Sequence, residues 1–321
     1  MAKPEIRVYL ILIFLPMEKI TSLLVAPFTA YRPDGEINTD IVGEYASLLK
    51  KNGIGGAFIN GSSGEGYLLT TEERMLLAEA WTKQQTPEFK VMVHVGATCL
   101  KDSRQLAQHA ASIGAWGIGS MAPPFPPIGR VNELVDYCAT IADATPQLPF
   151  YFYHIPVFNH VGFPMLDFLK AADGVIPNLA GIKYTHENLY DFNQCMLYKN
   201  GKYDMLHGQD ETLLAGLALS GIKGGISGTG NYIGNILTGV IKAWNRQDTE
   251  QARKLQNYAQ EVINVICHYR GNIVAGKCIM KLLGLDLGPN RTPFRNMTDD
   301  EQQQMKLELE AIDFFHHCNT I

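Results

Sequence analysis

From Met17 onwards, short apolar runs alternate with longer stretches whose apolar residues recur at helical spacing. The short runs have the length of buried strands, and polar or glycine-rich residues follow them. The runs predict strands at residues 22–28, 57–60, 90–95, 116–122, 150–156, 180–185, 203–207 and 223–227. The amphipathic stretches predict helices at residues 39–51, with Thr39 as N-cap, 71–84, with a Thr-Glu-Glu cap signature, 102–113, 131–144 and 211–220.

Eight strands in alternation with helices predict an α/β protein, a (β/α)₈ TIM barrel. The other architecture considered, a doubly wound open sheet, requires a glycine fingerprint after the first strand, and residues 26–30 do not provide one. After residue 235 the pattern is helical only, with stretches at 236–245, 249–269, 275–282 and 299–315. The sequence therefore predicts a barrel with a C-terminal helical extension.

This pattern divides the chain into three parts. Residues 17–235 are predicted to form the catalytic barrel domain, and residues 236–321 to form helices packed on it. Residues 1–16 are interpreted as a poorly structured extension upstream of the natural start. Their apolar run at 8–15 is too short to span a bilayer and no small-residue cleavage site follows it, although an outer strand or a membrane anchor stays open.

Composition limits the classes of partner. The formal charge is −5 and basic blocks are absent, which argues against nucleic acid and membrane surfaces as partners. The six cysteines are scattered without a CxxC pair, which predicts reduced thiols in a reducing compartment, the cytoplasm. We expect no metal and no cofactor, because the histidines show no metal-binding spacing and residues 316–318 (His-His-Cys) are interpreted as a frayed, solvated tail.

The candidate chemistry begins with Lys183, which lies inside the apolar run 180–185. Burial lowers the pKa of a lysine, and the neutral amine is the nucleophile of Schiff-base catalysis. A lysine at a strand end that reaches solvent or a carboxylate is the alternative. Because strand side chains alternate, Thr185 shares the inner face with Lys183, and Tyr153 can point inward from the preceding strand. An amine, a phenol and a hydroxyl are thus predicted near one end of the barrel.

A hydroxyl pair follows the second predicted strand. Ser62 and Ser63 stand between glycines in the segment Gly61–Gly66. Glycines allow successive backbone N–H groups to point at one anion, and the two hydroxyls add donors for a carboxylate. A generic turn is the alternative. Glu65 is expected to hold the loop through hydrogen bonds.

Two further segments follow the last two predicted strands. Asp210 and Glu211 come after Gly208, either as acceptors for substrate hydroxyls or as partners of a helix dipole. The glycine-rich loop after the last strand contains Ser227 and Gly228 and lacks the signature of a P-loop. All these candidates fall at carboxyl ends of strands, where barrel enzymes carry their active sites.

Together these segments resemble the N-acetylneuraminate lyase family, a branch of the pyruvate-dependent class I aldolases that includes dihydrodipicolinate synthase. The resemblance covers nearly the whole chain from about Met17 onwards. It rests on the hydroxyl-pair loop at residues 61–65, the Tyr-x-Ile-Pro strand at 153–156 and the Schiff-base strand at 181–183. Residues 148–156 look like the lyases of animal type in particular.

The resemblance implies a role for each candidate. Lys183 would form an imine with pyruvate or with the ketone of a sugar acid, and Tyr153 would relay the proton. The substrate-binding positions implied are Ser62 and Ser63 for the pyruvyl carboxylate, Thr185 near the imine, and Gly208, Asp210, Glu211, Ser227 and Gly228 around the hydroxylated tail.

Three departures from the family accompany this resemblance. Dihydrodipicolinate synthases carry an arginine shortly after the tyrosine motif, where residues 157–159 read Val-Phe-Asn, and an interface tyrosine where this chain has Phe125. The loop after the eighth strand usually reads Gly-Ser-Thr-Tyr-Asn, whereas residues 227–231 read Ser-Gly-Thr-Gly-Asn. Gly228 therefore stands where a sugar-contacting serine is expected. Either Ser227 compensates or the acceptor specificity differs.

The function implied by the resemblance is cofactor-free, reversible cleavage of N-acetylneuraminate, a sialic acid, to N-acetylmannosamine and pyruvate. This reaction belongs to sialic acid catabolism within carbohydrate metabolism, and the resemblance implies a cytoplasmic homotetramer. The alternatives are an aldolase for another 2-keto-3-deoxy sugar acid, a dihydrodipicolinate synthase-like enzyme and a non-catalytic sialic-acid sensor. A sensor would be free to lose Lys183 or Tyr153, and both are present.

Overall fold

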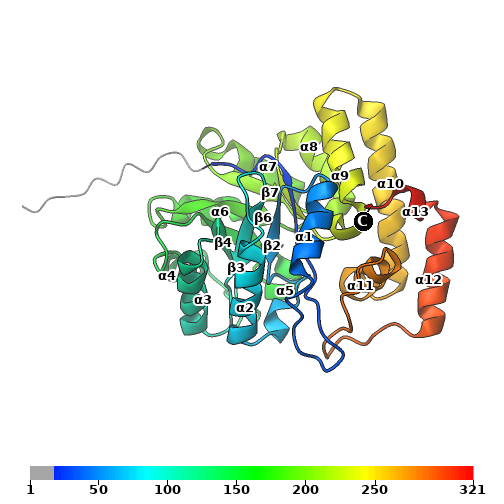
Figure 1. The fold of residues 1–321 in the computed structure, drawn as a ribbon. Coiled ribbons are helices and arrows are strands. Elements are labelled where there is room, and N and C mark those ends of the chain that lie inside the picture. The colour runs from blue at the N-terminus through cyan, green and yellow to red at the C-terminus, as the bar shows by residue number, and fades with distance from the viewer. Residues whose placement is uncertain (1–17, 321) are drawn as a thin grey trace, which may run out of the picture.

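The computed structural model describes residues 18–320, which contain a closed barrel of eight parallel strands (Figure 1). Each strand pairs with the next along the chain, and β1 pairs with β8 to close the barrel. The strands are β1 Leu23–Val25, β2 Gly56–Ile59, β3 Lys90–His94, β4 Gly117–Met121, β5 Phe150–His154, β6 Leu179–Tyr184, β7 Asp204–His207 and β8 Gly225–Ser227. The predicted TIM barrel is confirmed.

Helices surround the barrel and continue beyond it. Figure 1 shows α10, α12 and α13 gathered on one side of the barrel. The helices are α1 Val42–Lys51, α2 Thr71–Thr82, α3 Leu100–Ser112, α4 Val131–Ala142, α5 Pro156–Asn159, α6 Met165–Ala172, α7 Leu189–Leu197, α8 Leu213–Ser220, α9 Gly230–Asn245, α10 Thr249–His268, α11 Asn272–Leu282, α12 Asp299–Ala311 and α13 Phe314–His317. None of these described helices is long and apolar enough to cross a membrane.

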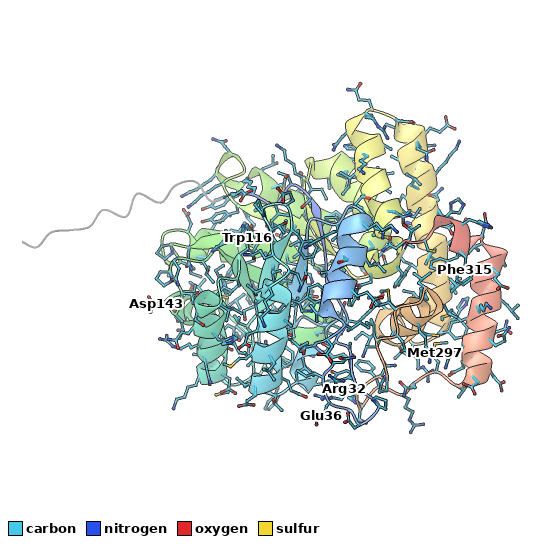
Figure 2. All side chains as sticks on the ribbon, in the orientation of Figure 1. Arg32, Glu36, Trp116, Asp143, Met297 and Phe315 are labelled. Carbon is cyan, nitrogen blue, oxygen red and sulfur yellow. The ribbon has the colours of Figure 1, made fainter. Side chains whose placement is uncertain are left out.

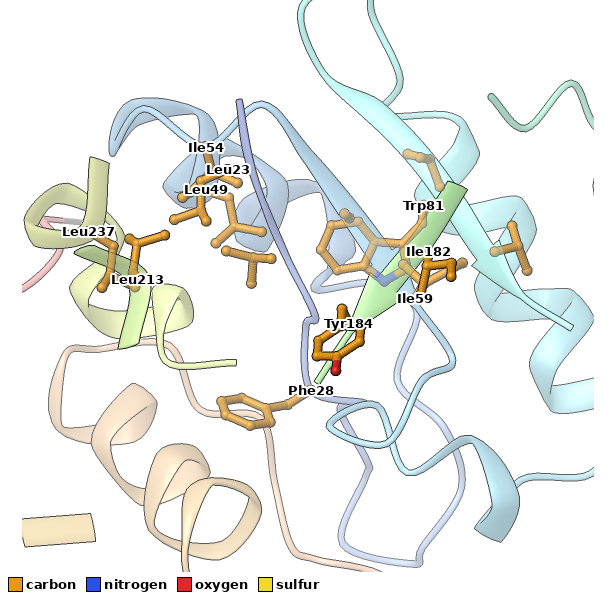
Figure 3. Packing of buried hydrophobic residues seen from close by; sticks show 14 of the residues in the cluster. Leu23, Phe28, Leu49, Ile54, Ile59, Trp81, Ile182, Tyr184, Leu213 and Leu237 are labelled. Carbon is orange, nitrogen blue, oxygen red and sulfur yellow. The ribbon is translucent and has the colours of Figure 1, made fainter. Parts of the chain in front are cut away.

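Alternation along the strands produces two apolar layers. Outward side chains, such as Ile182 of β6, join a large cluster between barrel and helices, while inward side chains, such as Tyr153 of β5, join a smaller cluster inside the barrel. Figure 3 shows part of the outer cluster, where Leu23 of β1 lies near Leu49 of α1 and Ile54. Each large side chain buried in this way contributes about 1.5–3 kcal/mol to stability.

Two predicted helix starts need correction. Thr39 is not an N-cap, because α1 begins at Val42 and no side chain caps it. Helix α2 starts with a capping box, as expected, but its N-cap is Thr70, whose hydroxyl accepts from the backbone N–H of Glu73. The carboxylate of Glu73 accepts from Thr70 N in return.

The expected domain border at residue 235 falls inside a helix. Helix α9 follows β8 and contacts β1, as the eighth helix of a barrel does. The helices that extend beyond the barrel are therefore α10 to α13. The extension expected at residues 1–16 lies outside the described residues.

The chain end was expected to be a frayed, solvated tail; His316 and His317 are indeed exposed, but the expectation of fraying is wrong. Residues 314–317 form α13, and Asn319 is only 2% exposed. The side-chain amide of Asn319 donates to the backbone oxygens of Gly230 and Asn231, both at 3.0 Å. In Figure 2, Phe315 lies on the side of the C-terminal helices and Asp143, at the end of α4, on the opposite side of the barrel. The tail is thus bound to the start of α9.

Candidate active site at the carboxyl end of the barrel

Lys183 lies inside the barrel near the carboxyl end of β6. Its register partner on β5 is Tyr153, and its Nζ lies 3.9 Å from the centroid of the Tyr153 ring. The ring of Phe58, on β2, covers the amine from a second direction at 4.3 Å. Burial lowers the pKa of Lys183 to about 7, and the negative charge of Asp210 opposes this effect. A large fraction of the amine is therefore neutral near pH 7, as addition to a carbonyl requires.

Tyr153 connects the amine to the hydroxyl-pair loop. Its phenol oxygen and Ser62 Oγ share a hydrogen bond of 2.9 Å. Burial raises the pKa of Tyr153, and the bond to Ser62 partly offsets this shift. The phenol is consequently protonated at neutral pH and can pass a proton along the contact with Ser62.

A buried ion pair anchors the loop that carries Ser62 and Ser63 to helix α11. Glu65, which adopts a left-handed backbone conformation (φ 56°), lies 2.5 Å from Lys277 Nζ of α11. Both side chains are at most 3% exposed, whereas Ser62 and Ser63 are partly exposed. Glu65 also accepts a long hydrogen bond from Arg291 N (3.4 Å), so it holds the loop by a backbone hydrogen bond, as expected, and by an ion pair.

Thr185 and Gly208 meet at the ends of β6 and β7. A Cβ placed on Gly208 would lie 2.1 Å from Thr185 Oγ1, so only glycine allows this approach. The backbone N–H of Gly208 donates to the oxygen of Tyr184 at 2.9 Å. Both predicted residues therefore border the same end of the barrel as Lys183.

The two carboxylates after β7 occupy different environments. Asp210 is 8% exposed, and its Oδ2 accepts hydrogen bonds from Gly228 N (3.1 Å), Thr229 N (2.8 Å) and Thr229 Oγ1 (2.7 Å). Asp210 therefore organises the loop after β8. Glu211 is only partly buried, and its Oε1 accepts one long hydrogen bond from Gln209 (3.4 Å). Of the pair, Glu211 is the carboxylate more available to a ligand.

The loop after β8 brings Ser227 and Gly228 to the site in unequal ways. Ser227 is 0% exposed and its Oγ accepts from the backbone N–H of Gly230 at 2.7 Å. Of the two alternatives considered, compensation by Ser227 is the less supported, because its hydroxyl already accepts a hydrogen bond within its own loop. Gly228 is partly exposed, and a Cβ placed there would lie 3.6 Å from Ser63 Oγ.

Two wall residues, Phe58 and His94, were not identified from the sequence. The His94 ring of β3 packs edge-on against Tyr153 with centroids 6.2 Å apart, and its Nε2 accepts from Met121 N at 3.2 Å. Burial, followed by the charges of Arg74 and Lys183, holds the pKa of His94 well below its usual range. A neutral imidazole therefore lines the site. Strand alternation along residues 90–95 was the signal that could have located it.

A closed parallel barrel with a buried lysine at the carboxyl end of a strand is an arrangement suited to a class I aldolase, and the family match and the relatives show that the protein is a lyase of this class. Residues 19–312 match the model of the Dihydrodipicolinate synthetase family, and the chain belongs to this family. The resemblance noted in the sequence is thereby confirmed. Within the described residues, no three or more His, Cys, Asp or Glu side chains are grouped so that they could hold a metal ion.

Individual relatives are lyases. The chain is 35% identical over 303 residues to the N-acetylneuraminate lyase of Homo sapiens, covering 93% of this chain and 94% of the relative. The N-acetylneuraminate lyase of Danio rerio is 36% identical over 282 residues, covering 86% and 91%. The structure of the N-acetylneuraminate lyase (sialic acid aldolase) from Aliivibrio salmonicida superposes with a TM-score of 0.89 at 32% identity, covering 94% of this chain and 100% of that one.

Proposed function

We propose that the protein cleaves N-acetylneuraminate reversibly to N-acetylmannosamine and pyruvate through a Schiff base on Lys183. The observation that carries this proposal is the position of the Lys183 amine, buried with a pKa of about 7 beside the phenol of Tyr153. Lyases related to this chain at about a third identity over nearly their whole length support the same reaction.

The neutral amine of Lys183 adds to the substrate ketone, and loss of water gives the imine. The substrate hydroxyl beyond the bond that breaks then gives up its proton through Tyr153 and becomes the aldehyde of N-acetylmannosamine. The two electrons of the broken carbon–carbon bond move into the protonated imine, which becomes an enamine. The enamine takes a proton on carbon, and water hydrolyses the resulting imine to release pyruvate and restore Lys183.

The other candidates position the substrate. Ser62 and Ser63 bind the pyruvyl carboxylate in this proposal, and the hydrogen bond between Ser62 and Tyr153 supports it by holding their loop beside the catalytic pair. Thr185 and Gly208 border the imine, and Glu211 accepts from hydroxyls of the sugar tail. Asp210 acts on the tail indirectly, through the loop that it holds.

Borohydride trapping tests the proposed function. Reduction in the presence of pyruvate should convert the labile imine into a stable secondary amine, located at Lys183 by peptide mass spectrometry. Lys183→Arg should not be trapped, because a guanidinium stays protonated and cannot form the imine. A trapped adduct at another lysine, or full activity of Lys183→Arg, would refute the mechanism.

A second candidate is an aldolase for another 2-keto-3-deoxy sugar acid. It is favoured by Gly228, which leaves the loop after β8 without a free hydroxyl. A substrate panel with pyruvate release as readout decides between the two sugars. A dihydrodipicolinate synthase-like activity has less support, because Val157 and Phe158, at the place of the expected arginine, are 73% and 49% exposed and apolar.

The resemblance also supports a homotetramer, and the six free cysteines support a reducing compartment, the cytoplasm. Phe125 follows β4, Val157 lies on α5 and Tyr190 on α7, so exposed apolar side chains follow three neighbouring strands on one rim of the barrel. An exposed apolar rim of this kind is typical of a subunit interface. Light scattering coupled to size exclusion should give four copies, and a monomer at micromolar concentration would contradict this assembly.

A further inference from the structure

The loop after β8 presents no free side-chain hydroxyl to a ligand. Ser227 is fully buried and its Oγ accepts from Gly230 N, while the Thr229 hydroxyl donates to Asp210. Gly228, the partly exposed residue of this loop, has no side chain. A polar side chain that contacts a ligand at this point must therefore come from another element.

That side chain belongs to Asn272, the first residue of α11. A Cβ placed on Gly228 would lie 2.8 Å from Asn272 Nδ2 and 3.6 Å from Ser63 Oγ. The amide nitrogen thus takes up the space that a side chain at position 228 would need. It also lies on the same side of the loop as one of the two hydroxyls assigned to the substrate carboxylate.

The orientation of this amide is set by Tyr232 of α9. The Tyr232 hydroxyl, in a fully buried side chain, donates to Asn272 Oδ1 at 2.8 Å. With Oδ1 held, Nδ2 is directed toward Gly228, and within residues 18–320 no hydrogen-bond acceptor is bound to it. Asn272 is partly exposed, and its Nδ2 lies beside Gly228, the partly exposed residue of the loop after β8.

We propose that Asn272 is a specificity-determining residue that donates a hydrogen bond from Nδ2 to an oxygen of the sugar-acid tail. It replaces, from α11, a hydroxyl that the loop after β8 does not supply. This inference rests on the proposed aldolase function and adds a contact for its sugar substrate. Because Oδ1 is already engaged, the contact selects a substrate oxygen that can accept a hydrogen bond.

Two variants separate binding from support of the fold. Asn272→Ala should lower kcat/KM for sugar-acid cleavage about 10- to 100-fold, since a substrate oxygen loses its donor in a closed site. Borohydride trapping of pyruvate on Lys183 should stay at the wild-type rate. Asn272→Asp keeps the size and the bond from Tyr232 but replaces the donor with an acceptor, so it should lose at least as much. If Asn272 only supported the fold through its bond from Tyr232, Asn272→Asp would keep the wild-type kcat/KM.

Moving the polar group from position 272 to position 228 gives a further test. Gly228→Ser alone should weaken cleavage, because its Cβ would press on Asn272 Nδ2. Combined with Asn272→Ala, the serine gains room and a hydroxyl at the same place, so the double variant should recover most of the loss. Additive losses in the double variant would overturn the proposal.

Different measurements test the proposed reaction and the proposed role of Asn272, so that one can be refuted without the other. Cleavage of N-acetylneuraminate by the wild type tests the proposed reaction, and borohydride trapping tests the Schiff base on Lys183. The variants are then compared on whichever of N-acetylneuraminate and 2-keto-3-deoxygluconate the wild type cleaves faster. Unaltered kcat/KM in both Asn272 variants, or a proportional loss of pyruvate trapping in Asn272→Ala, would refute the role of Asn272.

Discussion

The carboxylate of Asp210 binds Thr229 twice, through the backbone N–H at 2.8 Å and through the hydroxyl at 2.7 Å. This relationship joins the junction after β7 to the loop after β8. Asp210 therefore supports the loop after β8, and its negative charge acts on the nearby Lys183.

Asp210→Asn should change both the loop and the amine. Loss of the charge removes the influence that raises the pKa of Lys183, so the acidic limb of the pH–rate profile should move to lower pH. Weaker bonds to Gly228 and Thr229 should lower kcat/KM for the sugar acid more than the rate of pyruvate trapping. Both can be measured on one preparation. If the acidic limb of the pH–rate profile stays at the wild-type pH, Asp210 does not influence the pKa of Lys183.

The lowered pKa of Lys183 predicts how imine formation and stability depend on pH. Only neutral Lys183 attacks the carbonyl, so the initial trapping rate with pyruvate should rise as the pH passes about 7 and then level off. Stability should follow. Between the folded pKa of about 7 and the ordinary value of 10.5, the unfolded chain binds more protons than the folded one. The free energy of unfolding should therefore rise with pH in this window relative to Lys183→Met, as urea titrations would show. If the free energy of unfolding changes with pH in the same way for the wild type and Lys183→Met, the pKa of Lys183 is not lowered.

Tyr153→Phe should reduce kcat about 10²- to 10⁴-fold, the contribution of a positioned acid–base group, while imine formation continues. Tyr151→Phe provides the matched control. Tyr151 points into the same barrel, but its hydroxyl donates to Asp204 at 2.9 Å, and Asp204 begins β7. That control should lower the melting temperature and retain turnover. Equal turnover in both variants would mean that Tyr153 only packs.

The buried pair of Glu65 and Lys277 gives a stability prediction. Glu65→Gln should lower the free energy of unfolding by about 3–5 kcal/mol, because it leaves the Lys277 ammonium buried without its partner. Lys277→Met in addition should recover part of this loss. Chemical denaturation of the three proteins measures the coupling. The KM for pyruvate should rise in Glu65→Gln, since the loop of Ser62 and Ser63 loses its support.

The strands could be predicted because each is an apolar run that ends in polar residues, and alternation then placed Tyr153 and Lys183 on one face. Helices α5 to α7 were missed. Helix α5 is one turn long and begins with Pro156, and α6 follows Pro164 with no capping side chain. A single turn carries too few periods to stand out from a loop, and α6 lacks a side-chain cap to mark its start. Helix α7 does have a capping side chain, Asn188, which was interpreted only as part of a polar stretch after the strand.

The use of side chains in loops could not be predicted. Whether the hydroxyl of Ser227 faces a ligand or caps Gly230 depends on backbone angles that the residue types allow in several combinations. The contact of Asn272 with Gly228 joins residues on different elements, and no local pattern connects them. Asp210 was recognised as polar and near the site, but its bonds to the next loop arise only when the barrel closes.

The bonds from Asn319 to Gly230 and Asn231 have a consequence for the order of events during translation. The ribosome completes the eighth strand long before it adds Asn319. A nascent chain can therefore close its barrel while the segment that follows the loop after β8 still lacks its anchor. Catalytic competence should then appear after barrel closure, when the later part of the chain has emerged and docked.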